Sequence, residues 1–255
     1  MYAEERQQAI ASLVLQKGRA SVAELAEVYD VTTETVRRDL AALDRAGLLR
    51  RVHGGAVPTR SLHLVESGVG ERDETRAEHK DRIAATAIDH LPAGCGSVLL
   101  DAGTTTARVA AQLPTDRELV VVTNSVPIAA RLAGMPTVHL QLLGGRVRGL
   151  TQAAVGDQAL RVLDTLRVDV AFVGANGISV EHGLSTPDSD EAAVKRAMVR
   201  AATRVVVTAD SSKAGREDFV SFAPLSSVDT LITDSELGDG YRRQFIERGV
   251  EVVVA

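Results

Sequence analysis

The sequence predicts a two-domain protein: an N-terminal, mainly α-helical winged helix-turn-helix and a C-terminal, doubly wound α/β domain. Residues 21–56 contain, in order, a helix, a turn, a second helix and a basic hairpin. From residue 97 onward, short strands rich in Val and Leu alternate with helical segments, as in parallel sheets that helices cover on both faces. We therefore expect domains at residues 1–57 and 73–255, joined by a linker at residues 58–72.

The N-terminal domain is expected to contain three helices. Ser21 is a good N-cap, and Glu24 three residues later completes a capping box. Thr32 is expected to cap the next helix, and Gly47 to end it. The predicted helices are Glu4–Gln16, Val22–Tyr29 and a third from Thr32 to about Ala46.

The third helix has the pattern of a DNA-recognition helix. Val36, Leu40 and Leu43 recur at helical spacing and should face the core, which leaves basic and polar side chains on the outer face near the N-terminus. The strand Leu48–Val52 and the following turn would form the wing. A solvated amphipathic helix is the alternative, but the order of elements favours DNA binding. The residues expected to contact DNA are Thr33, Glu34, Thr35, Arg37, Arg38, Arg50, Arg51 and His53.

Composition excludes several other classes of protein. The 255 residues have a formal net charge of −5, so DNA contact requires a local basic surface, which the arginines after residue 33 provide. Because aromatic residues make up 3%, a base-stacking single-strand binder is disfavoured. No signal peptide or membrane-length apolar run is visible, so we expect a cytoplasmic protein.

Metal and thiol chemistry are not expected. Cys95 stands between two glycines ahead of a strand, and we expect a small, partly buried residue there. His53 has no second ligand at metal spacing. We predict neither a cofactor nor a metal.

A helix is predicted over Glu71–Leu91, because apolar residues recur at helical spacing from Ile83 onward. Its charges at Glu78, Lys80 and Asp81 are expected to be solvated surface.

The C-terminal domain should contain seven strands and five further helices. The strands are predicted at Val98–Asp101, Leu119–Thr123, Val138–Leu143, Val168–Val173, Val205–Ala209, Thr230–Thr233 and Val250–Val254. The helices are predicted at Thr105–Gln112, Pro127–Ala133, Asp157–Leu163, Asp190–Ala202 and Tyr241–Arg248.

Polar residues and glycines follow five of these strands. In doubly wound sheets a ligand lies beyond the carboxyl ends of the strands, and threonine hydroxyls at a helix N-terminus suit a phosphate. Each loop alone is explained by helix capping, but five loops together favour a small anionic ligand. The candidates are Asp101, Gly103, Thr104, Thr105, Thr106, Thr123, Asn124, Gly144, Gly145, Arg148, Asn176, Gly177, Asp210 and Lys213.

These motifs resemble the DeoR family of bacterial transcriptional regulators over nearly the full chain. The resemblance rests on Glu5-Arg6-Gln7, on residues 35–40 and 51–56, on residues 101–105 (DAGTT), Thr123-Asn124 and Gly144-Gly145, and on residues 209–213 (ADSSK). It implies a repressor of a sugar uptake or catabolism operon that binds double-stranded operator DNA as a homo-oligomer, dimer or tetramer. It also implies a sensor domain with the fold of ribose-5-phosphate isomerase.

The resemblance further assigns ligand contacts. It implies that Gly103, Thr104, Thr105 and Lys213 hold the phosphate of a sugar phosphate. Asn124, Asn176, Glu191 and Lys195 are then candidates for sugar hydroxyls or supporting positions. Alternatively, Glu191 and Lys195 form an i,i+4 surface pair.

A sugar-phosphate isomerase with a DNA-binding appendage is the rival interpretation. Isomerisation needs a carboxylate base, and isomerases of this fold end their fourth strand in an acid-rich motif. Here residues 173–177 read VGANG, without an acid, although Asp188, Asp190 and Glu191 lie nearby in the sequence. We therefore predict a sensor and not an enzyme.

Residues 175–199 are similar to DeoR-type regulators of fructose operons. This similarity makes fructose 1-phosphate the first effector hypothesis. Glycerol 3-phosphate and tagatose or galactitol phosphates are the runners-up.

Overall fold

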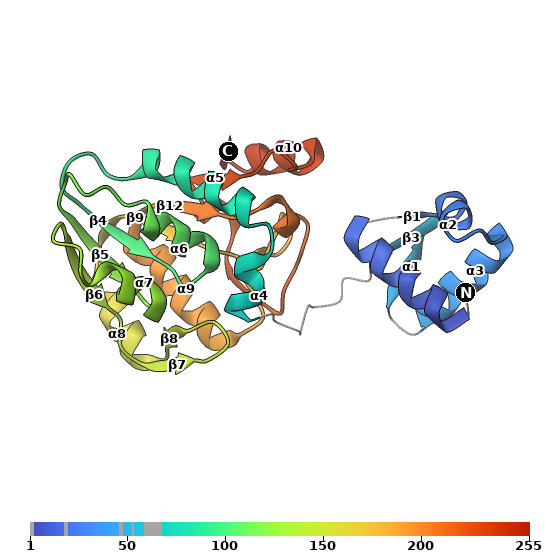
Figure 1. The fold of residues 1–255 in the computed structure, drawn as a ribbon, viewed down its shortest axis with the longest axis horizontal. Helices are drawn as coiled ribbons and strands as arrows, with labels where there is room; N and C mark the ends of the chain where they lie inside the picture. Colours follow the sequence, from blue (N-terminus) through green and yellow to red (C-terminus); the bar gives the residue numbers. More distant parts are fainter. Residues whose placement is uncertain (1–2, 18–19, 46–47, 53, 59–67) are drawn as a thin grey trace. The chain divides into compact units, whose positions relative to one another are not determined.

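The computed structural model describes residues 3–17, 20–45, 48–52, 54–58 and 68–255. The chain divides into two compact units, residues 1–62 and 63–255 (Figure 1). None of the helices in the described ranges combines the length and the apolar character needed to span a bilayer.

The first unit confirms the predicted order of elements. Three helices pack against a three-stranded antiparallel sheet in the order β1-β3-β2. The backbone N–H of Glu24 donates to Ser21 Oγ (3.1 Å), and that of Thr35 donates to Thr32 Oγ1 (3.2 Å), so both predicted caps form. The elements are α1 (Ala3–Lys17), β1 (Ala20–Ser21), α2 (Val22–Val28), α3 (Thr33–Arg45), β2 (Leu49–Val52) and β3 (Gly55–Pro58).

A small core holds this unit together. Apolar side chains from all three helices meet there, among them Leu25 and Leu40. Asp39 of α3 is also buried, and it accepts hydrogen bonds from Arg6 Nε (2.6 Å) and Gln7 Nε2 (2.9 Å) of α1. Gly55 is required where β3 crosses β1, because a Cβ there would lie 2.3 Å from the carbonyl oxygen of Ala20.

The second unit is built on a parallel sheet of seven strands, in the order β15-β14-β12-β9-β4-β5-β6. All seven predicted strands belong to it, with small shifts at their ends. Their bounds are β4 (Gly96–Leu100), β5 (Leu119–Thr123), β6 (Val138–Leu142), β9 (Val168–Val173), β12 (Ala202–Thr208), β14 (Thr230–Thr233) and β15 (Glu251–Val254).

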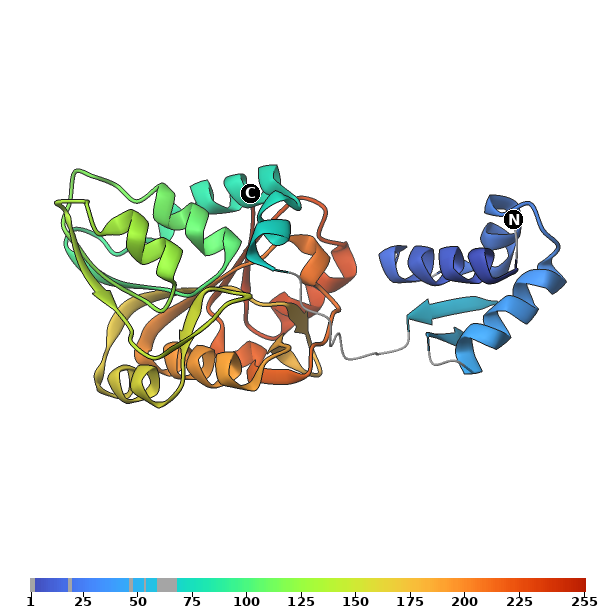
Figure 2. The same cartoon turned by 60° about the horizontal axis from the view of Figure 1, so that its bottom comes forward.

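Helices cover both faces of the sheet, as the predicted doubly wound fold requires (Figure 2). Alternate strand residues point to opposite faces: Val98 and Leu100 pack with α5, α6 and α7, whereas Leu99 packs with α8, α9 and α10. The helices are α5 (Ala77–Ala87), α6 (Thr104–Ala111), α7 (Val126–Leu132), α8 (Asp157–Thr165), α9 (Ser189–Ala201) and α10 (Asp239–Glu247).

Two small sheets and two short 3-10 helices, η2 and η3, were not predicted, because their few residues lack a periodic pattern, whereas η1 lies within the predicted helix Glu71–Leu91. One sheet pairs β7 with β8, and the other has the order β10-β11-β13. Their bounds are β7 (Arg146–Arg148), β8 (Ala153–Val155), β10 (Gly177–Ser179), β11 (Gly183–Thr186) and β13 (Val220–Ala223), with η1 (Ile88–His90), η2 (Ser211–Lys213) and η3 (Leu225–Ser227).

The predicted continuous helix Glu71–Leu91 is wrong. The chain forms α4 (Val69–Glu74) and then α5, and Arg76 between them has left-handed backbone angles (φ 55°, ψ 37°) that interrupt the helix. The last residues of the predicted linker therefore belong to α4, whereas residues 59–67 lie outside the described ranges. Cys95 is exposed, not partly buried, because it lies in the loop before β4.

The direction of winding reverses between β4 and β9. From β4 the chain adds β5 and β6 on one side, and it then returns to place β9 on the other side of β4. The connections after β4 and β9 consequently leave the sheet in opposite directions. This is the topological switch point, where open α/β sheets form a crevice.

Candidate functional site

A cavity of about 410 Å³ opens at this switch point. Its walls come from the loops after β4, β9 and β12, from α9, and from the α4–α5 region. Polar and glycine residues make up most of its lining: Glu71, Arg72, Thr75, Lys80, Gly103, Thr104, Thr105, Thr106, Asn176, Glu191, Lys195, Thr208, Asp210, Ser212, Lys213 and Arg216.

The N-terminus of α6 forms one wall of the cavity. Gly103 is its N-cap, and the first backbone N–H groups of a helix have no partner within it. These N–H groups and the positive end of the helix dipole favour an anion. The hydroxyl of Thr106 donates to the carbonyl of Gly103 (3.0 Å), so this threonine braces the turn.

Five cationic residues line the cavity, against three acids. Several are already paired: Lys195 with Asp101, and Arg216 with Asp218 at 3.3 Å. Within the described part of the chain, Lys213 has no carboxylate at ion-pair distance. The cavity therefore offers positive charge that a bound anion would neutralise.

Two of these lysines are partly desolvated. Burial lowers the pKa of the Lys80 ammonium to about 8, although the nearby carboxylate of Asp210 raises it. Burial also lowers the pKa of Lys213. Lys80 donates to the carbonyls of Arg72 and Thr75 (2.7 Å to the latter), so the prediction that it belongs to the solvated surface is wrong.

Glu191 and Lys195 are both buried, and neither is half of a surface pair. Glu191 accepts hydrogen bonds from Arg148 Nη1 (2.5 Å) and from the hydroxyl of Thr151. Lys195 contacts the carboxylate of Asp101 and donates to the carbonyl of Gly174 (3.1 Å). Both residues line the cavity with separate partners, which excludes the i,i+4 alternative.

The structure brings together nine of the sixteen candidate ligand residues. The lining residues among them are Gly103, Thr104, Thr105, Thr106, Asn176, Glu191, Lys195, Asp210 and Lys213. Asp101 and Arg148 do not line the cavity themselves. Asp101 forms an ion pair with the lining residue Lys195, and Arg148 forms one with the lining residue Glu191.

Five candidates do not line the cavity. Thr123 ends β5, Asn124 follows it, and Gly144 and Gly145 follow β6; both strands lie on the far side of β4 from β9. Asn124 instead accepts from the backbone of Ala102 (3.0 Å) and donates to Ala154 (3.2 Å). Gly177 packs against Arg216, whose carbonyl oxygen would lie 2.4 Å from a Cβ at that position.

Sequence reasoning missed the contribution of the α4–α5 region and of Arg216, and it named Ser212 only within the motif at residues 209–213. Glu71, Arg72 and Thr75 precede the apolar periodicity, which begins only at Ile83. The sequence does contain one sign of a binding role: Arg72 and Lys80 lie close together in a segment without an apolar pattern. This sign points to the cavity only once the fold has placed the segment beside the loop after β12.

The exposed face of α3 is polar and basic, as predicted. Arg37 and Arg38 have side chains that are 56% and 80% exposed, and Glu34 lies 3.8 Å and 3.5 Å from them. Thr33 is exposed, whereas the hydroxyl of Thr35 contacts that of Thr32 (2.9 Å). Arg51 is exposed in β2; His53 and the side chain of Arg50 lie outside the described part of the structure.

Both units match known protein families. Residues 6–61 match the DeoR-like helix-turn-helix domain, and residues 75–235 match the DeoR C terminal sensor domain.

Full-length relatives are similar along nearly the whole chain. HTH-type transcriptional regulator GlpR of Haloferax volcanii is 40% identical over 249 residues, which cover 98% of this chain and 96% of that protein. Uncharacterized HTH-type transcriptional regulator FruR of Bacillus subtilis is 34% identical, covering 98% and 100%. The glycerol-3-phosphate regulon repressor of Escherichia coli is 33% identical, covering 91% and 90%.

Among solved structures, ribose 5-phosphate isomerase A from Neisseria gonorrhoeae is similar to part of the chain. The TM-score is 0.42 at 16% identity, and the match covers 56% of this chain and 55% of that one. This likeness is too weak to support a functional inference.

The buried pair of Asp101 and Lys195 should stabilise the wall of the cavity. Asp101→Asn leaves a buried ammonium without its counter-ion, so we expect the free energy of unfolding of residues 63–255 to fall by about 3 kcal/mol. Urea unfolding followed by circular dichroism measures it. The double variant Asp101→Asn/Lys195→Met should recover part of the loss; a double variant no more stable than the single one contradicts the interpretation.

Proposed function

Because the chain belongs to the DeoR family of transcriptional regulators, we propose that it represses a sugar uptake or catabolism operon under the control of a phosphorylated sugar. α3 and the β2–β3 wing bind operator DNA, and the cavity between β4 and β9 binds the effector. The relatives are named as regulators, and the chain is a regulator and not an enzyme.

The observation that supports this proposal most is the character of the cavity. It combines an excess of cations, the N-terminus of α6 and several hydroxyl and carboxylate groups. Cations and helix N–H groups suit a phosphate, whereas carboxylates and amides suit sugar hydroxyls. Its volume lies in the range of small-ligand sites. A phosphorylated monosaccharide has all of these features.

The phosphate is assigned to the Gly103–Thr105 turn and to Lys213. Lys213 is half-buried, and no carboxylate at ion-pair distance neutralises its charge in the described chain. The sugar hydroxyls are assigned to Asn176, Glu191 and Asp210, which also line the cavity.

Fructose 1-phosphate is the first effector we propose, from the similarity of residues 175–199 to regulators of fructose operons. Glycerol 3-phosphate is the second, because one relative is the glycerol-3-phosphate regulon repressor of Escherichia coli. Titration calorimetry with each compound separates the two, since the true effector should bind far more tightly.

Control by the effector follows from linkage. The ligand prefers one arrangement of the loops at the cavity, and this preference shifts the population that binds DNA. We infer a homo-oligomer, because one winged domain contacts few base pairs and paired half-sites raise the affinity.

Arg38→Ala should weaken operator binding about 5- to 150-fold, since an arginine that contacts a base edge contributes about 1–3 kcal/mol. Its exposed side chain makes a folding defect unexpected. Fluorescence anisotropy with a duplex selected from a random-sequence pool measures the affinity. Arg161→Ala, an exposed arginine of α8, is the control. Wild-type affinity in Arg38→Ala and in Arg37→Ala would exclude the recognition-helix assignment.

Lys213→Ala should yield a repressor that binds DNA yet ignores its effector. Losing one charge-assisted hydrogen bond to phosphate should weaken effector binding about tenfold or more. Calorimetry measures this loss, and anisotropy with the selected duplex shows whether DNA binding persists. Normal release from DNA by the effector would remove Lys213 from the site.

Effector affinity should depend on pH through Lys80. The free protein holds this lysine neutral above pH about 8, and a bound phosphate favours its charged form. Affinity is therefore full between pH about 6.5 and 7.5, where phosphate is doubly charged, and it falls as pH rises through about 8. Lys80→Arg keeps its charge over this range and should flatten the profile measured by calorimetry. If effector affinity fell with pH in the same way in wild type and in Lys80→Arg, the charge of Lys80 would not contribute to effector binding.

A further inference from the structure

α4 is both a wall of the cavity and the start of the described sensor unit. Glu71, Arg72 and Thr75 of the α4 region line the cavity. In sequence, α4 follows directly on residues 59–67, which connect it to the wing strand β3. Any change in the position of α4 therefore acts on the segment that leads to the DNA-binding unit.

Contacts with groups at the cavity hold α4 at both ends. At its start, the backbone N–H of Val69 donates to the carbonyl of Leu150 (3.1 Å), in the turn between β7 and β8. The same hairpin provides Arg148 and Thr151, which contact Glu191 in the cavity wall. At its end, Lys80 donates to two carbonyls of the α4 region.

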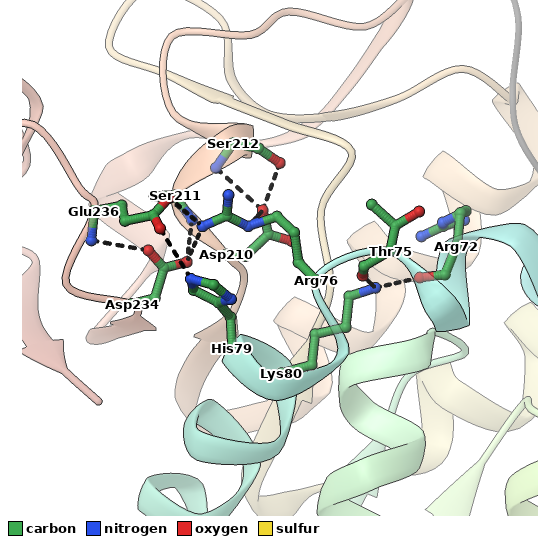
Figure 3. Close-up of polar contacts among 10 residues, drawn as sticks. All are labelled: Arg72, Thr75, Arg76, His79, Lys80, Asp210, Ser211, Ser212, Asp234 and Glu236. Atoms are coloured by element: carbon green, nitrogen blue, oxygen red, sulfur yellow. Dashed lines mark hydrogen bonds and ion pairs between the residues drawn. The ribbon is translucent and has the colours of Figure 1, made fainter.

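Arg76, at the junction of α4 and α5, contacts side chains from the loops after β12 and β14 (Figure 3). Its guanidinium lies 3.3 Å from Asp210, 3.2 Å from Asp234 and 2.8 Å from Glu236. It also donates to the hydroxyl of Ser211 (3.1 Å). Asp210 belongs to the loop after β12 that lines the cavity, whereas Asp234 and Glu236 follow β14.

A metal ion is a poorer explanation of this cluster. His79, Asp234 and Glu236 each offer an atom within 4.8 Å of the others. However, the guanidinium of Arg76 already contacts both carboxylates, and the backbone N–H groups of Ser211 and Glu236 donate to Asp234. The cation that these acids neutralise is therefore Arg76.

We propose that Arg76 is the positioning residue that transmits occupancy of the cavity to α4, and through α4 to the segment leading to the DNA-binding unit. Asp210 is shared between the cavity and Arg76, so a ligand that moves or engages Asp210 changes the restraint on the α4–α5 junction. While Asp210 moves, the contacts with Asp234 and Glu236 hold Arg76 against the loop that follows β14. This inference rests on the proposed function for the identity of the ligand, but not for the anchoring of α4.

The test uses the full-length protein as wild type, Arg76→Gln and the control Arg161→Gln. Without ligand, hydrogen exchange of residues 69–75 should accelerate about tenfold or more in Arg76→Gln, because the charge-assisted contacts with three carboxylates are lost. With fructose 1-phosphate or glycerol 3-phosphate, calorimetry should show affinity close to wild type. Saturating effector should nevertheless change the affinity for the selected duplex far less than in wild type. Arg76→Lys should restore only part of this response, since an ammonium cannot span three carboxylates.

Three results would overturn the proposal. They are unchanged exchange in residues 69–75, a wild-type response of DNA binding to effector, or loss of effector binding as complete as in Lys213→Ala. If wild type binds neither compound, the proposed effectors fail, while the exchange measurement alone still decides whether Arg76 anchors α4. Should Arg76→Gln not fold, Glu236→Gln removes the exposed partner of the cluster and should shift exchange and response in the same direction.

Discussion

The reversal of winding between β4 and β9 is the constraint on which the rest of the second unit depends. It opens one crevice in a sheet that helices otherwise cover on both faces. Three loops meet there with the N-terminus of α6 and with α4. Because the crevice is polar and lies beside buried strands, its charged groups are partly desolvated, which strengthens their interactions with one another and with an anion.

Desolvation explains the pattern of pairing around the cavity. Lys195 and Glu191 are buried and Arg216 is partly buried, and each contacts an opposite charge. Lys213 and Lys80 lack such a carboxylate at close range among the described residues, and burial lowers the pKa of both. The cavity wall thus contains charged residues that are already ion-paired, and two lysines, Lys80 and Lys213, whose charge a bound anion could neutralise.

The division into two units separates two electrostatic tasks. Exposed arginines on α3 remain hydrated and weakly paired with Glu34, so a duplex can replace these contacts at little cost. Arg76 is the opposite case, held by acids from two loops beside the cavity. Arginine side chains therefore lie in two settings, hydrated on the exposed face of α3 and ion-paired in a partly buried cluster beside the cavity.

The sequence by itself determined the elements and their types. Helix caps at Ser21 and Thr32, seven apolar strands and the polar loops after them follow from local pattern, because hydrogen bonding and side-chain periodicity act over a few residues. Only the tertiary structure decided which loops form the cavity. It excluded Thr123 and Gly144, whose strands lie beyond β4, and it included Arg72 and Lys80. Strand order depends on packing between residues far apart in the chain, so it cannot be predicted from local sequence patterns.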